Sequence, residues 1–221
     1  MDNGNWNRIA LLSSAYLGPV QYYFKIVSYP LILIERFETY HKQSYRNRCI
    51  ILSANGPLVL SIPIVEGPRA KAKMYELQLS YDHNWQEIHW RSIVSAYKNS
   101  PFFDYYADEL APFYHERHWK YLIDYNSEIQ DIVLKAINYK PDIKYSESYI
   151  KSGETPDEID DFRYSIHPKP HRQTIDSEFK AVPYQQVFND QFTFTPNLSN
   201  LDLLLNEGPK TLEVLRSCHK I

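Results

Sequence analysis

Glycine is scarce in this sequence, with six among 221 residues. Neither a GxGxxG pattern nor a GxxxxGK(S/T) pattern occurs, so the glycine-rich loops that hold phosphates in dinucleotide-binding and P-loop proteins are excluded. Positive charge is not in excess either, because 24 lysines and arginines face 27 acidic residues and the net charge is −3. Nucleic-acid binding is therefore not expected. Any anion that the protein binds must be held by a local cluster of side chains.

Cysteine is almost absent: Cys49 and Cys218 are the only two, and they lie far apart in sequence. No CxxC or Cys/His spacing typical of zinc sites is present, so neither a zinc site nor a disulfide scaffold is supported. His167 and His171 are four residues apart, but the two prolines between them disfavour a helical metal site. We expect no metal ion, with a loop site as the minor alternative, and no cofactor is indicated.

Long hydrophobic runs are missing as well. No stretch approaches the ~20 apolar residues that a transmembrane helix needs. The first residues, MDNGNWNRIALLSSAYLG, begin with an acid and lack the basic segment and long apolar segment of a secretory signal. We therefore expect a cytoplasmic protein without a transmembrane segment.

Tyrosine, by contrast, is abundant, with 19 residues. A tyrosine side chain joins a large apolar face to a polar tip, which suits polar pockets and contact surfaces. Semi-buried packing is the more common explanation, since aromatic residues are usually structural. The tyrosine content alone therefore does not identify a binding surface.

The N-terminal part of the sequence predicts a βαβ unit. Residues 9–12 form a short apolar run that predicts a buried strand. Pro19 suits the first turn of a helix, and the residues after it repeat apolar side chains at helical spacing. Residues 31–37 predict a second strand, which the helical crossover would place parallel to the first.

The segment RCIILSANGPLVLSIPIV predicts a β-hairpin. Two runs rich in β-formers flank Asn55-Gly56, a pair favoured where both central turn residues have positive φ. Residues 74–82 predict a further strand. Helices are expected over 84–100, over 101–116 with a break at Pro112, and over 119–137.

A last helix is expected near the C-terminus, over residues 200–206. Ser199 is the expected N-cap, Asp202 the capping-box acid, and Gly208 the residue that ends the helix. A capped start and a glycine end make this one of the better-defined elements of the sequence.

These elements predict an α/β fold, with a mixed α+β arrangement as the alternative. A central mixed sheet would hold the βαβ unit and the hairpin, with helices packed around it. We expect a main α/β domain at 1–142, a long irregular insertion or loop at 143–182, and a C-terminal segment at 183–221 that packs back on the main domain. The predicted core includes Ile9, Leu11, Leu33, Ile51, Leu60, Ile62, Ile93, Val94, Ile129 and Val133.

The segment KQSYRNRCII is the strongest candidate for an anion site. On an extended strand Arg46 and Arg48 would point to the same face, with Tyr45 and Asn47 on the other, and Lys42 would precede them in a loop. Two guanidinium forks on one face could grip a phosphate or carboxylate bidentately. The alternative is a pair of arginines in surface ion pairs on the solvent face of a strand, which would contribute little.

Two further residues could take part in chemistry. His89 follows Trp85 by one turn of the expected helix, and a histidine can act as a general base because its ordinary pKa is about 6.5. A half-buried structural histidine is the more common outcome. Tyr16 lies between the first strand and helix, at the ligand crevice of open α/β sheets, where it could stack on a base or sugar. A serine nucleophile is not expected, because Ser13 and Ser14 lack the G-x-S-x-G elbow.

Four blocks of the sequence follow, in order, the pattern of a known family. They are LLSSAYLGPVQYYFKI, then QSYRNRCIIL with GPLVLSIPI, then the helix that ends in SPFF, and last YQQVF with PNLSNLDLLLNEGP. On these blocks the chain resembles the WbqC-like proteins over most of its length, excluding about 143–182. Each block alone is weak, but the ordered set is specific.

The resemblance implies a role in bacterial surface-polysaccharide (O-antigen) biosynthesis. One implied activity is transfer of an acyl or aminoacyl unit to a nucleotide-linked sugar, so the expected partner is an anionic small molecule such as a nucleotide sugar or an acyl donor. The alternative is a non-catalytic binding or assembly protein of the same pathway. Convergence of Arg46, Arg48, Tyr16 and His89 on one concave pocket would favour the enzyme.

Overall fold

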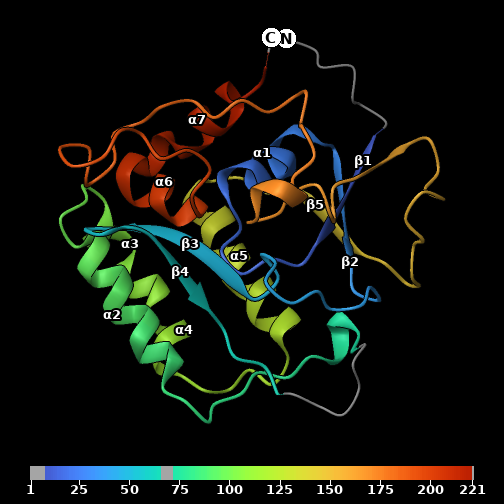
Figure 1. The fold of residues 1–221 in the computed structure, drawn as a ribbon, viewed down its shortest axis with the longest axis horizontal. Coiled ribbons are helices and arrows are strands. Elements are labelled where there is room, and N and C mark those ends of the chain that lie inside the picture. The colour runs from blue at the N-terminus through green and yellow to red at the C-terminus, as the bar shows by residue number, and fades with distance from the viewer. Residues whose placement is uncertain (1–7, 66–71, 221) are drawn as a thin grey trace.

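The computed structural model describes residues 8–65 and 72–220 of the chain. Residues 1–7 lie outside the described residues. They begin the N-terminal segment in which the sequence showed no secretory signal. The parallel strands lie on one side of the molecule, and the helices α2, α3 and α4 lie on the other, beside a separate hairpin (Figure 1). The class is α/β, as predicted.

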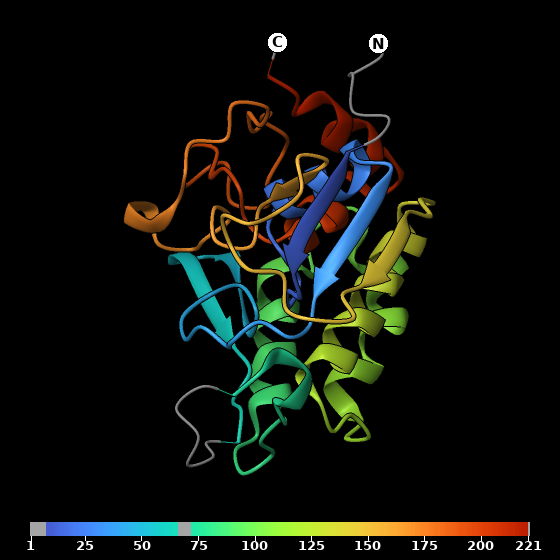
Figure 2. The same cartoon turned by 90° about the vertical axis from the view of Figure 1, so that its right-hand side faces the viewer.

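The βαβ unit is present where the sequence predicts it. It consists of β1 (Ile9–Ser13), α1 (Val20–Ser28) and β2 (Leu31–Glu35), and β1 pairs with β2 in parallel. Pro19 is the residue before the helix, where its missing N–H costs nothing. Figure 2 shows β1 and β2 running in the same direction toward the loop that leads to the hairpin.

Two more strands complete the sheet, and both come from beyond residue 141. They are β5 (Asp142–Tyr145), which pairs with β2, and β6 (Ile159–Asp161), which pairs with β1. The order is β5-β2-β1-β6, and every pairing is parallel. The prediction of an irregular segment at 143–182 is therefore wrong for these strands, which are too short and polar to show a strand pattern alone. The division of the chain into three segments stays a prediction.

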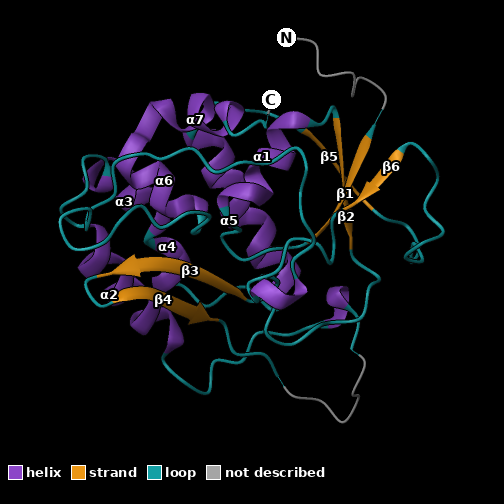
Figure 3. Cartoon of the chain, turned by 45° about the horizontal axis from the view of Figure 1, so that its top comes forward, coloured by secondary structure: helices purple, strands orange, loops and turns teal. Residues whose placement is uncertain are grey.

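The hairpin forms as predicted but stands apart from the central sheet (Figure 3). It consists of β3 (Arg48–Ser53) and β4 (Gly56–Ser61), which form a two-stranded antiparallel sheet. Within residues 8–65 and 72–220 no strand joins this hairpin to the parallel sheet, so the predicted central mixed sheet is not formed there. The turn of the hairpin also differs from the expectation. Ser53 pairs with Gly56, so the two turn residues are Ala54 and Asn55, and only Gly56 has a positive φ, at +99°.

Gly56 is the residue on which this turn depends. Gly56→Ala is expected to lower the free energy of unfolding by about 1–2 kcal/mol, because an L-residue is strained at this backbone angle. A Cβ atom at Gly56 would meet nothing within 4 Å, so the cost comes from the backbone alone. Chemical denaturation measures it. Asn55→Ala is the control, and equal losses for both variants would contradict the argument.

The next helices lie close to their predicted bounds. They are α2 (Trp85–Tyr97), α3 (Phe103–Leu110), α4 (Pro112–His115), α5 (Leu122–Ala136) and α6 (Asn200–Glu207). The helix α7 (Thr211–Ser217) was not predicted. The break at Pro112 is confirmed. The strand predicted over 74–82 is wrong: a 3-10 turn, η1 (Met74–Glu76), is followed by single bridges from Gln78 and Leu79. These residues reach two different partners, so no ladder forms.

The predicted core is confirmed. Seven of its ten members are buried, and Ile9, Leu33 and Val94 are half-buried, so none faces solvent. The start of α6 is confirmed in part, because the Ser199 hydroxyl accepts the backbone N–H of Leu201 and Gly208 ends the helix with a φ of +53°. Asp202 is not a capping-box acid.

Asp202 is instead a buried junction between three elements. Its carboxylate accepts hydrogen bonds from the hydroxyls of Tyr97 and Tyr184, at 2.9 and 2.6 Å, and from the amide of Gln186. Burial nevertheless raises the pKa of Asp202 above its ordinary value. The carboxylate therefore ties the C-terminal segment to α2 rather than capping its own helix.

Candidate functional site

The carboxyl edge of the parallel sheet is where the chain gathers its buried charges. Successive strands are added on one side of β1 up to β5, and β6 then pairs on its other side. The strand order thus reverses at the β1–β6 boundary, and ligands of open α/β sheets bind beyond the carboxyl ends of strands at such a point. Ser13 and Asp161 end these two strands.

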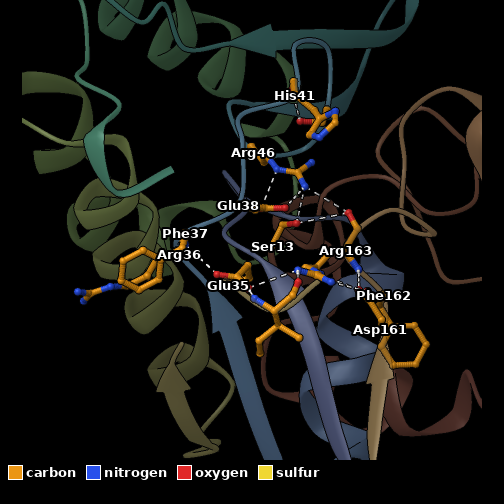
Figure 4. A network of polar contacts seen from close by, with 12 residues as sticks. Ser13, Glu35, Arg36, Phe37, Glu38, His41, Arg46, Asp161, Phe162 and Arg163 are labelled. Carbon is orange, nitrogen blue, oxygen red and sulfur yellow. Dashed lines mark hydrogen bonds and ion pairs between the residues drawn. The ribbon is translucent and has the colours of Figure 1, made fainter. Parts of the chain in front are cut away.

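Arg46 belongs to this edge (Figure 4). It is buried, and its Nε and one Nη donate to the two carboxylate oxygens of Glu38, while the same Nη donates to the Ser13 hydroxyl at 2.7 Å. Arg46 precedes β3 and lies in a turn. The prediction that Arg46 and Arg48 share a strand face is therefore wrong, because the strand begins only at Arg48.

A second buried guanidinium lies beside the first. Arg163 donates to both carboxylate oxygens of Asp161 and reaches Glu35 at 3.3 Å and the Ile150 carbonyl at 2.6 Å. Glu35 also accepts the backbone N–H groups of Phe37 and Ile150. This network links β2, β6 and the segment between β5 and β6.

The cavity at the edge is small. Its volume is about 20 Å³, and its lining includes Ser13, Ser14, Tyr45, Arg46 and Arg163. Such a volume holds about one water molecule. In this conformation the edge is a filled, charged junction rather than a pocket for a nucleotide.

An open groove lies on the other side of the 40–48 loop. Its volume is about 700 Å³, within the range of small-molecule sites. The residues that define this polar groove include Lys42, Gln43, Asn47, Arg48, Asp82 and His83. Arg48 pairs with Ser61 across the hairpin, and Ser61 lines the same groove. The structure thus brings three of the predicted ligand-binding residues together: Lys42, Asn47 and Arg48.

Two polar atoms of the groove residues are buried without a hydrogen-bond partner. They are the Nε of Arg48 and the Oδ1 of Asn47, while the amide nitrogen of Asn47 donates to the Ile62 carbonyl at 2.8 Å. A buried polar group without a partner is costly, so such atoms call for a bound water or ligand. Both atoms belong to residues that line the groove.

Tyr16 and His89 lie together, and neither side chain lines either cavity. The Tyr16 hydroxyl is 3.0 Å from His89 Nδ1 and 3.0 Å from the Tyr114 hydroxyl. Both side chains are buried, and the Trp85 ring packs edge-on against the imidazole. Burial lowers the pKa of His89 to about 4, which a hydrogen bond to the Ser61 backbone partly opposes.

The four residues that were expected to converge therefore occupy three places. Arg46 is in the edge network, Arg48 is in the polar groove, and Tyr16 and His89 are in the aromatic core. A base with a pKa of about 4 is unprotonated but weak at neutral pH. The catalytic role of His89, the stacking role of Tyr16 and the substrate-binding role of Tyr45 stay predictions.

The comparisons with known proteins bear on this arrangement. The sequence model of the WbqC-like protein family matches residues 14–167. The chain belongs to the WbqC-like protein family. The match begins after β1 and spans α1, β2, the hairpin, the polar groove and the edge network except Ser13, and it ends before the C-terminal helices.

The WbqC-like chain is also similar to a protein of Mycobacterium tuberculosis that is named "Uncharacterized protein Rv1507c". The two are 23% identical over 235 residues, which cover 96% of this chain and 99% of the mycobacterial one. No solved structure matches the WbqC-like chain. The groove and the network are therefore described from this chain alone.

No helix within residues 8–65 and 72–220 is long and apolar enough to cross a membrane. In the same ranges, no three His, Cys, Asp or Glu side chains are grouped so that they could hold a metal ion.

The sequence reasoning missed several residues of both places. Glu35 is the last residue of β2 and Glu38 lies three residues later, and an acid at the end of an apolar strand is a signal that could have been used. His83 lines the groove beside Asp82, four residues after the bridge at Leu79. Nothing in the sequence marked Arg163 as a site residue, because β6, which ends two residues before it, was not recognised as a strand.

Proposed function

We propose that this WbqC-like protein binds an anionic small molecule in the polar groove and acts as a transferase of bacterial surface-polysaccharide assembly. The observation that carries the proposal is the groove itself, which brings Lys42, Asn47 and Arg48 to a space of about 700 Å³. That space accommodates a nucleotide-linked sugar or an acyl donor. Because the net charge is −3, short-range contacts must hold the ligand.

The groove contains a guanidinium group that can bind an anion and an imidazole that can act as a base. Arg48 can donate to phosphate or carboxylate oxygens from its guanidinium, which is the geometry such groups prefer. His83 lines the same groove and can accept a proton. In the proposed acyl transfer, an acceptor amine or hydroxyl attacks the acyl carbonyl and gives its proton to His83, and the donor's leaving group departs with the bonding electrons.

A non-catalytic role in the same pathway is the second candidate. It is favoured by the separation of Arg46, Arg48 and the Tyr16–His89 pair into three places, because their convergence on one pocket was the sign expected of an enzyme. Burial also raises the pKa of the Cys49 thiol, so Cys49 is not an activated nucleophile. A binding protein would hold the ligand in the groove without turnover. Product analysis after incubation with an acyl donor and an acceptor sugar separates the two.

Arg48→Gln is expected to weaken binding of a nucleotide sugar by about 1.5–3 kcal/mol, the contribution of a charge-assisted hydrogen bond. UDP-N-acetylglucosamine, UDP-glucose and acetyl-CoA are the probes, and isothermal titration calorimetry measures affinity. Arg48→Lys keeps the charge and is expected to recover part of the loss.

The matched control is Arg91→Gln, because Arg91 is an exposed arginine on α2 whose ion partner is Glu87. It should bind each probe as the parent does, and both variants should unfold at nearly the parent's midpoint. If the parent binds none of the probes, or if Arg48→Gln binds them as well as the parent does, the groove is not the proposed site.

A further inference from the structure

A second group of cations lies above the carboxyl edge of the sheet, around the ring of Tyr164. The Arg46 guanidinium carbon is 5.7 Å from the centre of that ring, and the His41 ring is 5.4 Å from it. Arg46 and His41 come from the loop after β2, while Tyr164 follows β6. Two loops at the strand-order reversal therefore meet at this ring.

His167, three residues after Tyr164, has a defined orientation. It is 8% exposed, and its Nδ1 accepts the backbone N–H of Lys169 at 3.0 Å. The neutral ring must then carry its proton on Nε2, which is left as a donor. Nε2 has no hydrogen bond within the chain among the contacts that the structure describes.

The charges around these rings do not balance. Glu38 is paired bidentately with Arg46 and so neutralises it. Lys169 and Arg172, from the segment after β6, form no ion pair with any residue that the structure describes. The acids of that segment are engaged elsewhere, since Asp176 and Glu178 both bind the buried ammonium of Lys25. The site is left with positive charge that nothing offsets.

The same two arginines lower the pKa of both histidines. Burial lowers the pKa of His41, Arg46 and Arg172 lower it further, and Glu38 opposes them. Burial also lowers the pKa of His167, followed by the positive charges of Arg172, Arg46 and Lys169 and opposed by its own backbone hydrogen bond. Arg46 and Arg172 are the groups common to both histidines. The contacts agree with this: Arg46 and His41 both lie against the Tyr164 ring, and the amide of Gln173, the residue after Arg172, donates to the His167 carbonyl at 2.8 Å.

We propose that His41, Arg46, His167 and Arg172 form a second anion site, which binds a phosphate group at the strand-order reversal of the sheet. We name these four residues the His–Arg cluster. It is separate from the polar groove, which is lined by other residues of the same 40–48 loop. This site is additional to the proposed function, because a ligand in the polar groove can bind without a phosphate in the His–Arg cluster. A transferase with two anionic substrates would bind one in the groove and the other in the cluster.

A phosphate fits this chemistry better than a neutral sugar hydroxyl. The Nε2–H of His167 and the guanidinium of Arg172 donate hydrogen bonds and accept none. A dianion would also favour the charged form of both imidazoles, so binding should be accompanied by uptake of protons. His83 in the groove can also take up a proton, so the two sites are distinguished by whether the uptake falls in His167→Gln.

Calorimetric titration of the whole chain with inorganic phosphate, at low ionic strength, tests the site. Arg172→Gln and His167→Gln are each expected to weaken binding about tenfold, the effect of one charge-assisted hydrogen bond. His171→Gln is the matched control, because His171 is an exposed neighbour that affects neither cluster histidine. Arg48→Gln, in the groove, should leave phosphate affinity unchanged.

A second titration uses sulfate, which stays a dianion throughout, in two pH 7 buffers that differ in ionisation enthalpy. The parent is expected to take up protons, and His167→Gln is expected to take up fewer. The proposal is overturned if phosphate fails to bind, if Arg48→Gln weakens binding while Arg172→Gln does not, or if sulfate binds without proton uptake.

Discussion

Arg163→Met is expected to destabilise the protein by about 3–5 kcal/mol, the loss seen when one partner of a buried ion pair is removed. The guanidinium is fully buried, and the variant would leave Glu35, also fully buried, without its cation. Asp161 would lose a bidentate partner at the same time. Since Arg163 also holds the Ile150 carbonyl, the segment between β5 and β6 should come loose from the sheet.

Urea denaturation at pH 7 measures this loss. Lys135→Met is the control, because Lys135 pairs with Glu109 at 3.6 Å on an exposed surface, where ion pairs contribute at most about 1 kcal/mol. Adding Glu35→Gln to Arg163→Met should recover part of the stability, because it removes the unpaired charge. An Arg163→Met protein as stable as the Lys135→Met protein would show that the network does not hold the edge together.

The free energy of unfolding is expected to fall by about 3 kcal/mol through His89 as the pH is lowered from 6.5 to 4. Burial lowers the pKa of His89 from 6.5 to about 4 in the folded protein. Between these values the unfolded chain binds a proton at His89 and the folded chain does not. Stability from the neutral imidazole is therefore complete above pH 6.5 and is lost as the pH falls through the folded pKa.

The measurement is a series of urea denaturations between pH 7.5 and 4 on the parent and on His89→Gln. The glutamine variant should start less stable, since Tyr16 loses its imidazole partner, but its stability should fall less steeply with acid. His171→Gln, at an exposed position, should follow the parent curve. Parallel curves for parent and His89→Gln would mean that His89 is not buried in its neutral form.

Local patterns in the sequence predict most of the elements. The apolar spacing of α1, α2 and α5 reflects one buried face, so each helix is visible without its neighbours. The hairpin is visible because its turn residues and β-formers are adjacent in the chain. The strand predicted over 74–82 fails for the converse reason: a strand needs a partner, and this run meets only single bridges at Gln78 and Leu79.

The candidate sites, like the fold, were predicted only in part from the sequence. Composition and residue type were sufficient to select the 40–48 loop, whose Lys42, Asn47 and Arg48 line the polar groove. They were not sufficient to show that Arg46 and Arg48 have different surroundings. The strand begins only at Arg48, so Arg46 lies in the preceding turn and is buried, whereas Arg48 lines the groove. Composition and residue type also gave no sign that Arg163, more than 100 residues away, would meet the same loop, where Arg46 donates to its carbonyl.

By itself the sequence determined the class of fold, the βαβ unit, the hairpin and a loop rich in anion-binding side chains. These depend on periodicity and turn chemistry, which act over a few residues. Tertiary structure alone decided that β5 and β6 close the parallel sheet, that Glu35, Glu38, Arg46 and Arg163 are buried as ion pairs, and that Arg48 faces a groove. The reason is physical: a charge is stable in the interior only when a partner from a distant part of the chain meets it there, and short-range patterns carry no record of that partner.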